Sequence, residues 1–86
     1  MNVTDKFVID PNHSIEWGDA TWDKSDFSIR NRFNTAAGGF NLAGSSELPW
    51  HDFVLMITES IKREKFSNIE LSQILTEISN KLAKTP

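Results

Sequence analysis

The chain has 86 residues, a net charge of −3 and no cysteine. This length can fill one hydrophobic core, and disulfide stabilisation is excluded. The acidic balance argues against general affinity for nucleic acid, and no apolar run approaches the roughly 20 residues of a membrane span. We therefore expect one small α+β domain over residues 1–86, located in the cytoplasm and without a membrane partner.

The segment 1–44 is expected to be rich in β-structure and loops. Residues 7–9, which precede Pro11, are one candidate strand, and residues 14–17 are a weaker one. The polar residues 18–26 are expected to form a loop. Neither strand candidate shows long alternation, so their order in a sheet stays open.

The clearest strand is predicted at residues 27–33, where apolar and polar side chains alternate. Phe27 and Ile29 belong to one face of this strand, whereas Arg30 and Arg32 belong to the other. Gly38-Gly39 favours a turn, so residues 40–42 are the expected hairpin partner. The expected sheet is thus a short antiparallel hairpin or a three-stranded sheet.

A first amphipathic helix is predicted at residues 46–65. Its apolar side chains fall on one stripe at the spacing of an α-helix: Trp50, Phe53, Val54, Ile57 and Ile61. Pro49 suits the first turn of a helix, and Ser45 or Ser46 is a candidate cap.

A second amphipathic helix is predicted at residues 67–84. Ser67 and Glu70 have the spacing of a capping box, in which each side chain accepts a hydrogen bond from the other residue's amide. The apolar stripe of this helix includes Leu71 and Ile78. The short connection requires a hairpin or a sharp corner, and we expect the two stripes to pack together as a seam between Ile57 and Ile78.

Catalytic and metal-binding patterns are weak in this chain. His13 with Asp10, and His51 beside Asp52, are the only histidine–carboxylate pairs, and neither has the spacing of a recognised metal site. No nucleophile motif surrounds Ser45 or the neighbouring serine. The expectation is a protein that is not an enzyme and has no catalytic residues, no metal and no cofactor.

Arg30 and Arg32 are the candidate ligand-binding residues. Two guanidinium groups on one side of a strand can hold a carboxylate or phosphate. The alternative is that both arginines form ion pairs with nearby acids, namely Asp23, Asp26 or Glu47, and this alternative is favoured because the neighbourhood is acidic.

Five apolar residues are candidates for a protein interface. Leu55 and Met56 lie off the stripe of the first helix, and Ile69 lies opposite the stripe of the second. Trp17 and Trp22 stand among polar residues, where an exposed tryptophan would mark a contact surface.

The leading functional hypothesis is a small non-enzymatic protein-interaction domain, either a homodimer or the small partner of a larger protein. A short chain without disulfides gains stability readily from such pairing. The runner-up is a binding module for a small anionic ligand at Arg30 and Arg32, and an unrecognised enzyme is a third possibility.

Overall fold

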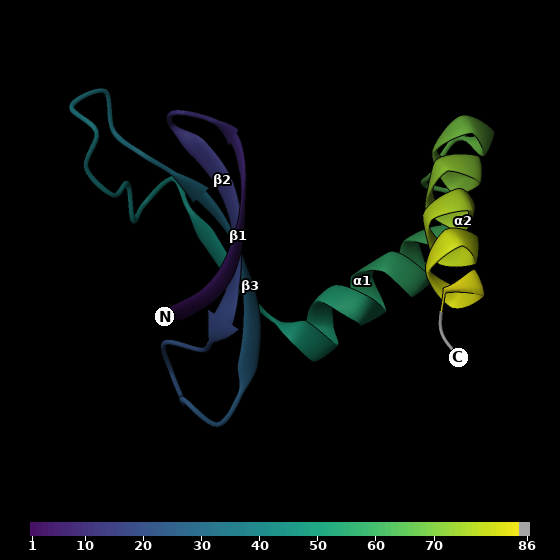
Figure 1. The fold of residues 1–86 in the computed structure, drawn as a ribbon, viewed down its shortest axis with the longest axis horizontal. Helices are drawn as coiled ribbons and strands as arrows, with labels where there is room; N and C mark the ends of the chain where they lie inside the picture. Colours follow the sequence, from purple (N-terminus) through teal and green to yellow (C-terminus); the bar gives the residue numbers. More distant parts are fainter. Residues whose placement is uncertain (85–86) are drawn as a thin grey trace. The chain divides into compact units, whose positions relative to one another are not determined.

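The computed structural model describes residues 1–84 and belongs to the α+β class (Figure 1). Two compact units make up the chain, one spanning Met1–Val54 and the other Leu55–Pro86. The first contains a β-sheet and the beginning of a helix, and the second contains the rest of that helix and a further one. Among the described residues, no helix is long and apolar enough to cross a membrane.

A four-stranded antiparallel sheet forms most of the first unit. Its strands follow one another in space in the order of the chain: β1 (Asn2–Asp10), β2 (His13–Asp19), β3 (Phe27–Phe33) and β4 (Ser46–Pro49). The predicted antiparallel sheet is confirmed, with one strand more than the three expected. β1 and β2 are also longer than the sequence candidates, and β2 includes residues 18 and 19 of the predicted loop.

Gly18 allows β1 to lie close to β2. A Cβ atom at residue 18 would stand 1.9 Å from the carbonyl oxygen of Asn2, so no other residue type fits without moving the strand. Two irregularities of register interrupt this pairing, one between Val3 and Asp5 and one between Val8 and Asp10. β1 therefore follows β2 closely but is bent at both ends.

The partner of β3 on its far side is β4, not the predicted residues 40–42. In the backbone register of the two strands, Arg30 lies opposite Glu47 and Ile29 lies opposite Leu48. Phe40 makes only an isolated backbone bridge to Asn34. The predicted helix start at residue 46 was wrong for the same reason, because residues 46–49 extend along β3 before the helix begins. A four-residue strand that ends in proline gives almost no alternation in the sequence.

The two faces of the sheet differ in chemistry, as the cross-strand register shows. One face, called the polar face here, carries mainly charged and hydroxyl side chains: Lys6, Val8, Ser14, Glu16, Ser28, Arg30, Arg32 and Glu47. The opposite face, called the apolar face, carries mainly aromatic and aliphatic side chains: Phe7, Ile15, Trp17, Phe27, Ile29, Phe33 and Leu48.

Helix α1 (Trp50–Lys62) begins directly after β4, and its first turn packs on one end of the apolar face. The ring of Trp50 meets that of Phe27 edge-on at a centroid distance of 5.4 Å and lies 5.3 Å from that of Phe53. Phe53 also lines a small hollow with Ile29 and Leu48. This is the part of α1 that belongs to the first unit.

The C-terminal end of α1 is closed by a left-handed residue. Glu64 has a φ of 60°, the Glu64 amide donates to the carbonyl of Ile61, and the Lys65 amide donates to that of Ser60. These two bonds define a Schellman motif with Glu64 in the position where glycine is usual. The helix thus ends before the predicted residue 65.

Helix α2 (Asn68–Ala83) begins with the predicted capping box. The Ser67 side chain accepts from the Glu70 amide, and the Glu70 carboxylate accepts from the Ser67 amide. The predicted seam along both helices was wrong. Leu71 and Ile74 are half-buried, but Ile78 is 49% exposed and α2 does not pack along α1. The connection is a corner and not a hairpin.

Candidate functional site

A buried ion pair occupies the centre of the polar face. The side chain of Glu16 is only 5% exposed, and its Oε1 atom lies 2.7 Å from Nη2 of Arg30 and accepts from Nε of Arg30 at 2.9 Å. Glu16 is directly opposite Arg30 in the β2–β3 register. The guanidinium and carboxylate therefore form a charge-assisted contact that neutralises both groups.

Arg32 stands beside this pair and is less completely engaged. Its Nη1 atom lies 3.5 Å from Oε2 of Glu16, and its Nε donates to the side chain of Asn34 at 3.1 Å. The side chain of Arg32 is 30% exposed, compared with 11% for Arg30. The two arginines of the sequence prediction thus share a face but not an environment.

The ring of Phe40 covers both arginines. The Cζ atoms of Arg30 and Arg32 each lie 4.7 Å from its centroid, which is within the range of cation–π attraction. Phe40 belongs to the connection between β3 and β4. The aromatic contact therefore holds this connection against the polar face.

The predicted ion-pair partners of the arginines were wrong, because all three acids serve other groups. Asp23 accepts from the amide and hydroxyl of Ser25, and these bonds hold the pKa of Asp23 below its ordinary value of 3.8. Asp26 accepts from Nε1 of Trp22 at 3.0 Å. Glu16 was missed in their place, and only knowledge of the β2–β3 pairing identifies it.

Glu47, the third of these acids, joins β4 to β3 and to the loop after β2. Its carboxylate accepts from the amide and hydroxyl of Thr21 and from the hydroxyl of Ser28, whose side chain is fully buried. Burial raises the pKa of Glu47, but these hydrogen bonds outweigh it and leave the pKa below its ordinary value of 4.5. Glu47 is thus a structural carboxylate.

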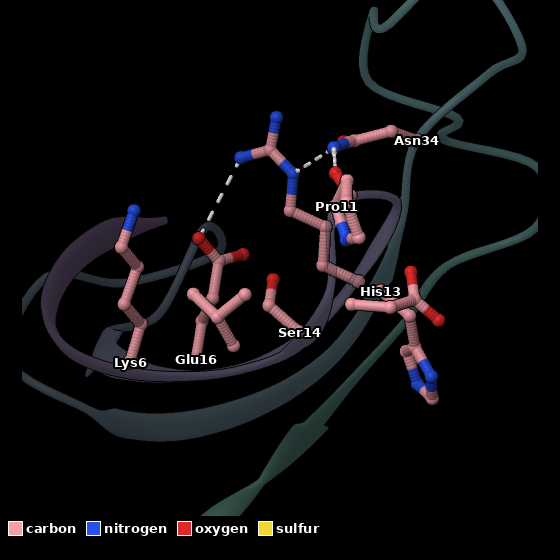
Figure 2. Close-up of a pocket in the computed structure, with 9 residues that line it drawn as sticks. Lys6, Pro11, His13, Ser14, Glu16 and Asn34 are labelled. Carbon is pink, nitrogen blue, oxygen red and sulfur yellow. Dashed lines mark hydrogen bonds and ion pairs between the residues drawn. The ribbon is translucent and has the colours of Figure 1, made fainter.

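A hollow of about 210 Å³ opens on the polar face next to Arg32. Figure 2 shows Lys6, Ser14 and Glu16 rising into it from neighbouring strands, with dashed lines from the guanidinium of Arg32 to Glu16 and Asn34. The Lys6 ammonium group forms no ion pair with any described residue. The hollow therefore contains two cations, Lys6 and Arg32, with unused hydrogen-bonding capacity.

The predicted interface residues lie on different elements. Leu55 and Met56 are exposed on α1, and Ile69 is exposed in the first turn of α2. Trp22 is exposed in the loop after β2. Trp17 is half-buried within β2 on the apolar face, inside the strand candidate 14–17, so it is not an exposed contact residue.

No group of three or more metal-ligating side chains converges within the part of the chain that the structure describes. His13 stacks on the ring of Phe33 at a centroid distance of 4.1 Å, and its Nε2 lies 2.6 Å from Oδ1 of Asn31. These contacts give His13 a role in the sheet.

The fold defines an α+β protein in which a four-stranded antiparallel meander precedes two helices. No family model, curated protein or solved structure matches the chain.

Proposed function

We propose that this chain is a small non-enzymatic protein-interaction domain that acts as a homodimer. The observation that carries the proposal is the exposure of two phenylalanine side chains, Phe7 and Phe27, on the apolar face of the sheet. Phe7 on this face is 59% exposed and Phe27 is also exposed, while Ala20 and Ile29 are the only apolar side chains that the described residues bury. A second copy of the chain offers the same apolar chemistry, which is what a two-fold contact requires.

The exposed apolar side chains of this face gain free energy when a partner removes them from water. Fully burying one large aliphatic or aromatic side chain contributes about 1.5–3 kcal/mol. A domain of this size buries only about 60% of the surface of its unfolded chain, so its own core leaves a thin margin of stability. Two or three additional buried side chains would be a large fraction of the total.

The non-enzymatic part of the proposal rests on chemistry. The buried carboxylate Glu16 is neutralised by Arg30, and Glu47 is satisfied by hydroxyl and amide donors. His13 is engaged with Asn31 and Phe33. These groups have structural partners and do not form a nucleophile–base pair, which supports binding as the function.

Two neighbouring residues of β1 provide the test. Phe7 and Val8 are almost equally exposed, at 59% and 57%, but they belong to opposite faces of the sheet. We expect the parent protein to have a dimeric mass by light scattering at high concentration. Phe7→Ser should weaken the dimer, whereas Val8→Ser should leave it intact. A parent protein that stays monomeric at all accessible concentrations would remove the homodimer.

A further inference from the structure

We propose that the hollow on the polar face is a binding site for the phosphate group of a small phosphorylated molecule, held by Arg32 and Lys6. This site lies on the side of the sheet opposite the proposed dimer contact, so the two proposals are independent. Three features of the hollow support this assignment: the unused donors of Arg32, the ammonium group of Lys6, which forms no ion pair with a described residue, and the local balance of charge.

Some N–H groups of the Arg32 guanidinium make no short hydrogen bond within the described part of the chain. Its Nε is committed to Asn34, and its Nη1 is 3.5 Å from Glu16, beyond the usual length of a charge-assisted hydrogen bond. Glu16 is already bound at short distance by Arg30. The remaining N–H groups of Arg32 are therefore available to a ligand, and a planar guanidinium matches the spacing of phosphate oxygens.

Lys6 is held on the same face by β1. Lys6 lies opposite Glu16 in the backbone register of β1 and β2, so its side chain rises next to that carboxylate. The two side chains do not come close enough to form an ion pair. Lys6 and Arg32 line the hollow from two sides, and Ser14 between them adds a hydroxyl group. A ligand oxygen in this space would meet two cations and a hydroxyl donor.

The local charge favours an anion although the whole chain is acidic. Arg30 neutralises Glu16, which leaves Lys6 and Arg32 against one other lining carboxylate, that of Asp10. Asp10 accepts a hydrogen bond from the amide of Asn12. The hollow thus has a net positive charge in a chain whose net charge is −3. A phosphate group has enough oxygens to accept from Arg32, Lys6 and Ser14 at once, whereas a carboxylate has only two oxygens.

The test is a titration of the full chain with inorganic phosphate at constant ionic strength, followed by amide NMR. We expect amide chemical-shift changes that saturate with phosphate concentration and are confined to residues lining the hollow, including Lys6, Ser14 and Arg32. Arg32→Gln and Lys6→Gln should each weaken binding about tenfold or more, because each removes a charge-assisted contact. Lys24→Gln makes the same change of charge in the loop after β2 and should leave the affinity unchanged.

Two further arms make the result decisive. Arg32→Lys keeps the charge but loses the forked geometry, so it should bind with intermediate affinity, and its spectrum will show whether the sheet is intact. Acetate at the same ionic strength should not saturate the site. Shifts that do not saturate, equal weakening by Lys24→Gln, or equal binding of acetate would each overturn the proposal.

Discussion

Glu64 holds a backbone conformation that most residue types avoid. Its φ of 60° is left-handed, and for a residue with a Cβ atom this costs about 1–2 kcal/mol relative to the right-handed region. The two hydrogen bonds of the Schellman motif at the end of α1 stabilise the turn in spite of this cost. The strain is local, so it can be tested with one substitution.

We predict that Glu64→Gly raises the free energy of unfolding by about 1 kcal/mol, because glycine adopts this φ without a steric penalty. Chemical denaturation followed by circular dichroism measures the change. Ser60→Gly, four residues earlier within α1, should lower stability by about 0.5 kcal/mol, since glycine is a poor helix former there. A loss of stability in both variants would contradict the left-handed assignment.

Glu70 makes the start of α2 sensitive to pH. A hydrogen bond from the Ser67 amide lowers the pKa of Glu70 below its ordinary value of 4.5. A carboxyl group whose pKa is lower in the folded state contributes stability that is fully present above its unfolded pKa. This contribution is lost as the pH falls through the folded pKa.

We therefore predict that helix content and stability decrease as the pH is lowered below about 4.5, and that Glu70→Gln removes part of this decrease. Thermal unfolding followed by circular dichroism between neutral and acidic pH measures the effect. Glu77→Gln, in the middle of α2, leaves the capping box intact and should keep the dependence of the parent. Identical profiles for the parent and Glu70→Gln would show that the box contributes nothing.

Sequence reasoning identified this capping box but could not identify Glu64. The box is a pattern of residue types at fixed spacing, and Ser67 and Glu70 fit it without any knowledge of the fold. A left-handed glutamate has no such signature, because glycine or asparagine is the usual indication of that conformation. The left-handed φ of Glu64 accompanies the two hydrogen bonds that end α1, and these are visible only in the structure.

At the scale of elements, the β2–β3 pair depends on the buried contact between Glu16 and Arg30. We predict that Glu16→Gln lowers the free energy of unfolding by about 3–5 kcal/mol, because it leaves a largely buried guanidinium without a counter-charge. Equilibrium denaturation measures this cost. A loss below about 0.5 kcal/mol, which is typical of exposed pairs, would show that water reaches the pair.

The matched control is the double variant Glu16→Leu, Arg30→Met. Replacing both members of a buried ion pair with apolar side chains of similar size is often neutral or stabilising. The double variant should thus recover most of the stability that Glu16→Gln loses. Failure to recover it would indicate that the cation–π contact of Arg30 with Phe40 is the more important interaction.

The elements that could be predicted were those whose sequence shows a strong hydrophobic periodicity. The alternating residues of β3 and the apolar stripes of both helices were recognised, and each corresponds to an element of the structure. β4 was not recognised, because four residues that end in Pro49 show no period and resemble a helix start. The ion pair was missed for a related reason: Glu16 and Arg30 meet only through the register of β2 with β3.

At the scale of the whole molecule, Leu55 and Met56 test whether α1 takes part in association. Both are exposed apolar residues on α1. We predict that replacing both with Lys gives a monomer of lower thermal stability, whereas the melting temperature of the parent rises with protein concentration. Calorimetry over a wide range of concentrations, together with light scattering, measures both effects.

Ser72→Lys with Ser79→Lys is the control for this pair. These exposed polar residues lie on a flank of α2, between its apolar stripe and the side that carries Ile69, and the double variant adds the same two positive charges. It should keep the mass and the concentration dependence of the parent. A monomer in this control as well would indicate that charge alone, rather than loss of apolar contact, separates the chains.

The order of the strands also determines how quickly the sheet can assemble. Every strand pairs only with its neighbours along the chain, so each pairing closes a short loop and costs little chain entropy. The turn between β1 and β2 contains two residues, whereas β3 and β4 are separated by residues 34–45. We expect the β1–β2 hairpin to form first and the β3–β4 pairing, which must close the longest loop, to limit the folding rate.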